Sequence, residues 1–112
     1  MVNYKVFTTD LFDREFKALC KKYPSAKSDV IQLVSQLKED PLQGTPLGKD
    51  CYKVRLAIRS KGRGKSGGAR LIARVRIIKE HIYLLSVYDK SVKNTITDKE
   101  LQNILNNLTE QD

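Results

Sequence analysis

The sequence predicts one α+β domain over residues 1–112, with its elements in the order β-α-α-β-β-β-α. Three observations support this prediction. The chain of 112 residues is long enough to close one hydrophobic core but too short for two. Apolar residues recur at helical spacing in its first half, and the spacing changes to two over residues 51–88. We therefore expect a mostly antiparallel, twisted sheet with a helical hairpin on one face and a short C-terminal helix.

The first half of the chain predicts one strand, two helices and a loop. Apolar residues alternate in the first segment and recur at intervals of three and four in the next two. Pro24 and Pro41 end the helices, because proline breaks helical geometry and disfavours it in the preceding residue. The segments are a strand over 2–8, a helix from the Thr9-Asp10 cap to Tyr23, a helix from a Ser28 or Asp29 cap to Asp40, and a loop over 41–50.

The second half predicts three strands and a helix. In residues 51–59, every second residue is apolar, and the residues between them include Lys53, Arg55 and Arg59. One face of this strand is therefore predicted to lie against the core and the other to be cationic. The fourth strand is apolar on both faces, which indicates an interior position. The segments are strands over 51–59, 70–78 and 82–88, a glycine loop over 60–68, a turn over 79–81, and a helix opened by a Thr97–Glu100 capping box.

Positive charge is concentrated in the middle of the chain. The net charge is +8, but residues 49–79 alone carry +10, with eleven Lys and Arg against Asp50. Such a regional excess predicts a polyanionic partner. Because the basic stretch is predicted to form strands and a loop rather than an amphipathic helix, nucleic acid is favoured over a membrane surface as the partner. No apolar run approaches the ~18 residues of a membrane span.

Several common site types find no support in the sequence. The glycine loop is not a P-loop, because Arg59 stands where the first glycine belongs and the following residues alternate like a strand. We therefore expect no nucleotide cofactor. The lone histidine, His81, is expected to be solvated in a turn, and no grouping has metal-ligand spacing. Cys20 and Cys51 are expected to be free thiols in a reducing cytoplasm, since no signal peptide is apparent.

The cationic strand faces are the strongest candidate site. If strands 51–59 and 70–78 pair as a hairpin, Lys53, Arg55, Arg70 and Arg74 cluster, which is destabilising unless a polyanion binds there. RNA cleavage does not require histidine, because the 2′-hydroxyl is an internal nucleophile and the protein supplies positioning and charge. Tyr88, at the end of the interior strand, could stack a base or exchange a proton.

Three segments resemble toxins of the RelE superfamily, nearest the HigB-type branch: YKVRLA at 52–57, GKSGGARLI at 64–72 and LLSVYDKSVKNTIT at 84–97. The resemblance implies the toxin of a type II toxin-antitoxin module, an mRNA interferase that cleaves mRNA on the ribosome and inhibits translation. The implied partners are a cognate antitoxin, mRNA and the ribosome, without a cofactor or metal.

The resemblance also implies roles for individual residues. Arg55 and Arg70 would lie on the scissile phosphate, with Tyr88 and Lys90 near the attacking hydroxyl or leaving group. Together with the cationic strand faces and the glycine loop, the expected RNA-binding residues are Lys53, Arg59, Lys61, Arg63, Lys65, Arg74 and Arg76.

Two other functions remain open at this point. The ParE branch of the superfamily shares the fold but poisons DNA gyrase, so fold alone does not decide function. A non-catalytic RNA-binding module would need only the basic face, and in that case charge would matter while Tyr88 would not.

Overall fold

The computed structural model describes residues 3–62 and 67–112. Its elements are β1 (Lys5–Thr8), α1 (Asp10–Lys22), α2 (Ala26–Glu39), β2 (Thr45–Gly48), β3 (Cys51–Leu56), the 3-10 helix η1 (Arg59–Lys61), β4 (Ala69–Arg76), β5 (His81–Asp89) and α4 (Asp98–Asn106). The predicted α+β class and helical hairpin are confirmed. The structure adds one short strand, β2, to the predicted order.

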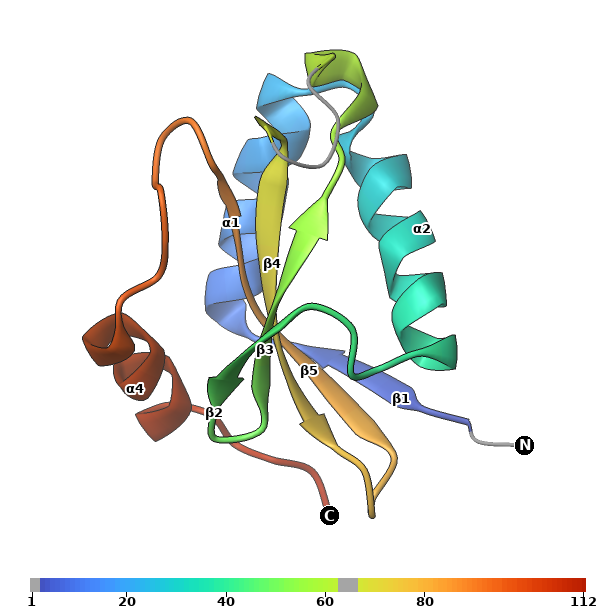
Figure 1. Cartoon of the computed structure of the whole chain (residues 1–112), viewed down its shortest axis with the longest axis vertical. Helices are drawn as coiled ribbons and strands as arrows, with labels where there is room; N and C mark the ends of the chain where they lie inside the picture. The colour runs from blue at the N-terminus through green and yellow to red at the C-terminus, as the bar shows by residue number, and fades with distance from the viewer. Residues whose placement is uncertain (1–2, 63–66) are drawn as a thin grey trace.

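The strands form one sheet in the order β1-β5-β4-β3-β2. The β2–β3, β3–β4 and β4–β5 pairs are antiparallel, and β1 lies parallel to β5. Figure 1 shows α2 and α4 on opposite sides of the strands. The β5 strand is buried along its whole length, as its apolar sequence predicts for an interior strand.

Each face of the sheet packs against its own hydrophobic cluster. On one face the helical hairpin contributes residues such as Phe12, Leu19 and Leu37, which pack with strand residues including Leu71 and Leu84. The cluster on the other face is smaller, and it joins strand residues to α4 and the segment before α4. Its buried members are Cys51, Ile72, Tyr83, Leu85, Tyr88, Ile96 and Leu101. The helix α4 therefore covers part of the face that carries the strand arginines.

The predicted loop over 41–50 contains the edge strand β2. Thr45 and Pro46 pair with Lys53 and Tyr52 of β3, and an edge strand tolerates proline because its outward N–H needs no partner. Gly44 has a φ of +100° and lies over the Lys53 carbonyl, where any Cβ would clash. Local glycine and proline content indicated a loop, but long-range pairing with β3 overrides that preference.

Other boundaries also differ from the prediction. The helix α2 begins at Ala26, earlier than the predicted Ser28 or Asp29 cap. The strand β3 ends at Leu56 because Arg59 bonds Asp29 through its backbone N–H and side chain and turns into η1. The solvated His81 predicted in the turn is wrong: His81 begins β5 and is buried, with its ring 4.9 Å from the Phe7 ring.

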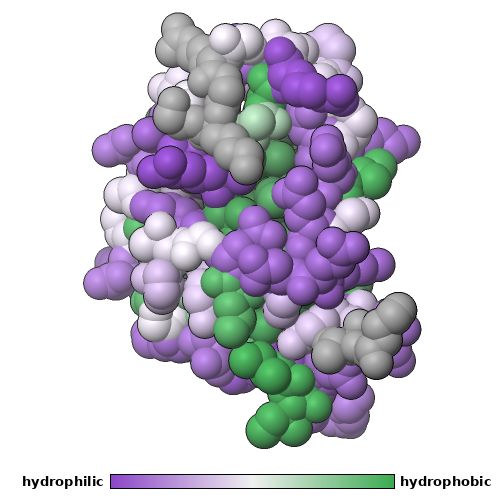
Figure 2. All heavy atoms as spheres, turned by 45° about the vertical axis from the view of Figure 1, so that its right-hand side comes forward, coloured by the Kyte–Doolittle hydropathy of each residue, from purple (hydrophilic) through white to green (hydrophobic). Residues whose placement is uncertain are grey.

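The turn between β4 and β5 forms an apolar tip. Ile77 and Ile78 are exposed there by 55% and 98% of their surface, and Figure 2 shows a hydrophobic patch at this end of an otherwise mostly hydrophilic face.

Across the described residues, no helix combines the length and apolarity needed to span a membrane.

Candidate functional site

Three predicted catalytic residues form a row across the three inner strands, near one end of the sheet. Arg55 of β3 pairs directly with Arg70 of β4, and Arg70 pairs directly with Tyr88 of β5. Side chains opposite one another on adjacent strands have Cβ atoms about 4.5–5.5 Å apart. The row is fixed by backbone pairing of three strands, so its spacing does not depend on a mobile loop.

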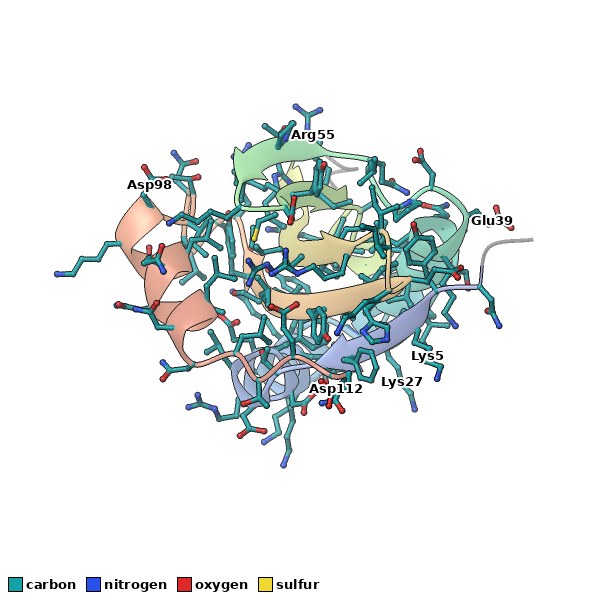
Figure 3. All side chains as sticks on the ribbon, turned by 90° about the horizontal axis from the view of Figure 1, so that it is seen from below. Lys5, Lys27, Glu39, Arg55, Asp98 and Asp112 are labelled. Atoms are coloured by element: carbon teal, nitrogen blue, oxygen red, sulfur yellow. The ribbon has the colours of Figure 1, made fainter. Side chains whose placement is uncertain are left out.

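Arg55 and Arg70 differ in exposure. Arg55 is exposed and, as Figure 3 shows, projects outward from β3, whereas Arg70 is only 5% exposed. One guanidinium nitrogen of Arg70 donates to the Ala69 carbonyl at 2.9 Å. Burial and the neighbouring Arg55 lower the pKa of Arg70, although arginine keeps its charge in proteins. Two adjacent guanidiniums repel, and an anion bound between them would relieve that repulsion.

Tyr88 closes the row in a buried position. It is 6% exposed, and its hydroxyl lies near Thr95 and Ile96 but makes no well-formed hydrogen bond to a described residue. Burial raises the pKa of Tyr88, against the smaller opposing effects of that segment and of Lys93. The Lys93 ammonium lies 5.3 Å from the centre of the Tyr88 ring. At neutral pH the Tyr88 hydroxyl therefore holds its proton and can act as a proton donor.

Two further predicted residues border the row. Lys53 is two residues from Arg55 on the same strand, and thus on the same face, opposite Ile72. Lys90 follows directly after β5, and its backbone N–H donates to the Gly68 carbonyl at 3.2 Å. Both lysines are half-buried.

Four predicted RNA-binding residues pair with carboxylates of the chain itself. Each ion pair joins segments far apart in the sequence: Arg59 with Asp29 at 2.8 Å, Lys61 with Asp89 at 2.6 Å, Arg74 with Glu110 at 3.5 Å, and Arg76 with Asp50 at 2.6 Å and Glu110 at 2.7 Å. The RNA-binding role of these four stays a prediction, but each already has a structural partner.

The predicted cluster of four cations is smaller in the structure. Arg74 stands opposite Cys51 on β3, four residues along the strand from Arg70, and its guanidinium turns to Glu110. The expectation that Arg74 joins Arg55 and Arg70 is therefore wrong. The strand register sets Arg74 opposite Cys51, away from the row, and its guanidinium pairs with Glu110 of the C-terminal tail. Arg63 and Lys65 lie outside the described residues.

The sequence prediction missed Asp89 as part of the site. This carboxylate is buried between Tyr88 and Lys90 and accepts hydrogen bonds from α1, η1 and the segment after β5. The signal available in the sequence was an acid at the end of an interior strand, inside a strongly basic region. Among the described residues, no group of three histidine, cysteine or acidic side chains is placed to hold a metal.

Comparison with known proteins identifies the family. A family model described as the RelE toxin of the RelE/RelB toxin-antitoxin system matches residues 4–110. The chain belongs to the RelE toxin family. The predicted resemblance to RelE-superfamily toxins is thereby confirmed, and it covers nearly the whole chain. No curated protein sequence matches this RelE-family chain.

Solved structures of E. coli RelE share its fold. A free E. coli RelE with two arginines replaced by alanine gives a TM-score of 0.60 at 16% identity, covering 97% of this chain and 100% of that one. RelE in the intact E. coli RelBE toxin-antitoxin complex gives 0.59 at 20% identity, covering 77% and 95%. The same RelE mutant bound to a peptide of the antitoxin RelB also gives 0.59, at 16% identity and with 97% and 100% covered.

Proposed function

We propose that this RelE-family chain is the toxin of a type II toxin-antitoxin module and acts in the cytoplasm as a ribosome-dependent mRNA endoribonuclease that inhibits translation. The observation that carries the proposal is the row Arg55, Arg70 and Tyr88 across three paired strands. Family membership supports the toxin assignment. The row supports cleavage, because it combines two cations for a phosphate with a buried, protonated hydroxyl.

The proposed reaction is an in-line attack within the RNA. The 2′-oxygen attacks the adjacent phosphorus, the bond from phosphorus to the 5′-oxygen breaks, and the products are a 2′,3′-cyclic phosphate and a 5′-hydroxyl. Arg55 and Arg70 stabilise the negative charge that develops on the phosphate oxygens. Lys90 in its uncharged amine form is the candidate to accept the 2′-hydroxyl proton, and Tyr88 is the candidate to donate a proton to the leaving oxygen.

This assignment makes one structural demand. The Tyr88 hydroxyl lies under the segment that contains Thr95 and Ile96, so that segment has to move before the hydroxyl can contact RNA. The segment precedes α4, which rests on the sheet through Ile96, Leu101 and partly buried leucines.

We further propose a cognate antitoxin as the regulatory partner. The support is that two of the similar solved structures are complexes of E. coli RelE with the antitoxin RelB or its peptide. At 16–20% identity these structures share the fold with this chain, so the antitoxin itself is to be found by co-purification.

The test is tightly induced expression in a bacterial host of the wild type, Arg70→Ala and Tyr88→Ala, with mapping of mRNA 5′ ends. The proposal predicts growth arrest with new mRNA ends for the wild type, and loss of both in the two variants at equal amounts of folded protein. Growth arrest with DNA damage and no new mRNA ends would instead indicate a gyrase inhibitor. Growth arrest that depends on Arg70 but not on Tyr88, with neither new mRNA ends nor DNA damage, would indicate a non-catalytic RNA-binding module.

A further inference from the structure

The end of β5 is held by one buried carboxylate. Asp89 is 8% exposed and lies in the chain between Tyr88 and Lys90, the two residues assigned to proton transfer. One carboxylate oxygen, Oδ2, accepts from the Tyr23 hydroxyl at 2.6 Å and the Lys22 ammonium at 2.9 Å, both at the C-terminal end of α1. The carboxylate therefore ties the last residue of β5 to the helical hairpin.

The other carboxylate oxygen binds the chain on both sides of β5's end. Oδ1 accepts from the Lys61 ammonium at 2.6 Å, and from the backbone N–H and hydroxyl of Ser91 at 2.9 and 2.7 Å. The Lys61 ammonium also donates to the Gly68 carbonyl at 3.3 Å, the same carbonyl that accepts the Lys90 N–H. Asp89 thus connects η1, the start of β4 and the segment that carries Lys90.

This geometry points to a role in positioning. We propose that Asp89 is a positioning residue for the cleavage site, holding Tyr88 and Lys90 in register with Arg70 by fixing the end of β5 to α1, η1 and Gly68. The inference rests on the proposed ribonuclease function and adds to it a residue that does not touch the substrate.

Asp89 is poorly suited to chemistry of its own. Its two oxygens are occupied by ammonium, hydroxyl and amide donors, and the bonds from Lys61, Tyr23 and Ser91, opposed by burial, hold its pKa far below the usual range. A carboxylate held in its charged form by such donors is a weak base. Its effect on the reaction therefore runs through the residues that it holds.

A matched control exists in the same region. Asp29 is the other buried carboxylate among the described residues, at 5% exposure. It holds the opposite side of η1, accepting from the Arg59 Nε at 2.8 Å and the Ser25 hydroxyl at 2.6 Å. In the described part of the chain, the hydrogen bonds of Asp29 anchor η1 to α2 and do not involve β5. We therefore expect substitution of Asp29 to disturb the fold to a comparable degree but to leave the row in place.

The test compares Asp89→Asn with Asp29→Asn in cleavage of an mRNA programmed on bacterial 70S ribosomes. Asp89→Asn is expected to lower kcat at least tenfold with KM changed less than twofold, at equal concentrations of folded protein. Asp29→Asn is expected to keep kcat within twofold. Wild-type kcat in Asp89→Asn, or an equal loss in both variants, would overturn the proposal.

Two further measurements separate this proposal from the proposed function. Faster hydrogen exchange of the Lys90 amide in Asp89→Asn than in Asp29→Asn supports positioning even if the wild type cuts no RNA, and equal exchange overturns it. Tyr23→Phe removes one hydrogen-bond donor to Asp89 but leaves the Asp89 carboxylate charged. It therefore tests the same proposal if Asp89→Asn does not fold. We expect a two- to fivefold loss of kcat for Tyr23→Phe, and an unchanged kcat would contradict the proposal.

Discussion

Arg70 has the position that the proposed chemistry needs most, between Arg55 on one strand and Tyr88 on the other. Its planar guanidinium can bind two phosphate oxygens, whereas a lysine supplies a single point charge. Arg70→Lys is therefore expected to lower the cleavage rate about 100-fold or more, the usual effect of losing one stabilising donor. Single-turnover cleavage measures it, with Lys38→Ala on the last turn of α2 as the control expected to keep wild-type activity.

The variant Tyr88→Phe tests whether the Tyr88 hydroxyl takes part in the chemistry. Its hydroxyl makes no well-formed hydrogen bond to a described residue, so Tyr88→Phe should change the free energy of unfolding by less than about 0.5 kcal/mol, below the ~1 kcal/mol of a typical hydrogen bond. If the hydroxyl donates a proton, the cleavage rate should fall about 10²- to 10⁴-fold. Urea unfolding and cleavage assays on the same preparation test both parts. An unchanged cleavage rate would show that a group other than the Tyr88 hydroxyl donates the proton.

At the residue scale, the sequence predicted what depends on local period. The alternation around Arg55 and Arg70 placed both on one face, and the structure confirms that they stand opposite one another. The roles of Asp89 and Glu110 were not predictable in the same way. Their partners lie far along the chain, so no local spacing reveals the contacts.

At the scale of elements, the C-terminal tail is a small clamp over the second face of the sheet. Glu110 forms ion pairs with Arg74 and Arg76, and the Gln111 N–H donates to the Tyr83 hydroxyl at 2.8 Å. The tail therefore follows α4 back onto β4 and β5. The contacts of α4 itself include the Thr97–Glu100 capping box and ion pairing of Lys93 with Glu100.

Glu110→Gln should loosen this clamp with little effect on overall stability. Both partners of the Arg76–Glu110 pair are about a third exposed, and ion pairs at such sites contribute about 0–1 kcal/mol. We expect a loss of under about 1 kcal/mol in unfolding free energy, with clearly faster hydrogen exchange of the Gln111 amide. Unchanged exchange at Gln111 would show that the Tyr83 contact alone holds the tail.

Element type was more predictable than element boundary. The helices and the three longer strands follow from apolar period, and the capping box predicted at Thr97 and Glu100 is present. The strand β2 and the 3-10 helix η1 were missed because tertiary pairing, with β3 and with Asp29, decides their conformation. The start of β5 at His81 was missed because burial against Phe7 depends on the distant strand β1.

At the scale of the whole molecule, buried carboxylates should make stability sensitive to acid. Burial raises the pKa of Asp89, but the hydrogen bonds that its carboxylate accepts from Lys61, Tyr23 and Ser91 together outweigh burial and lower it. Bonds accepted from Ser25 and Arg59 do the same for Asp29. A lowered folded-state pKa adds stability above the unfolded value of about 3.9, and that stability is lost as pH falls below it. Unfolding free energy should therefore drop steeply between about pH 4 and pH 2.

The matching variant makes this prediction specific. Asp89→Asn cannot titrate, so its unfolding free energy should depend less on pH, and its deficit against the wild type should shrink as pH falls below about 4. Urea unfolding at several pH values measures both curves. A deficit that stays constant down to pH 2 would contradict the low pKa of Asp89 and its paired state in the fold.

The Arg55, Arg70 and Tyr88 row is proposed to direct attack by the RNA's own 2′-hydroxyl. The most direct test is the chemistry of the ends produced when purified protein cleaves an mRNA programmed on bacterial ribosomes. We expect a 2′,3′-cyclic phosphate on one fragment and a 5′-hydroxyl on the other, with both absent for Arg70→Ala. Fragments with 5′-phosphates would show attack by water instead, and cleavage that persists in Arg70→Ala would place the reaction elsewhere.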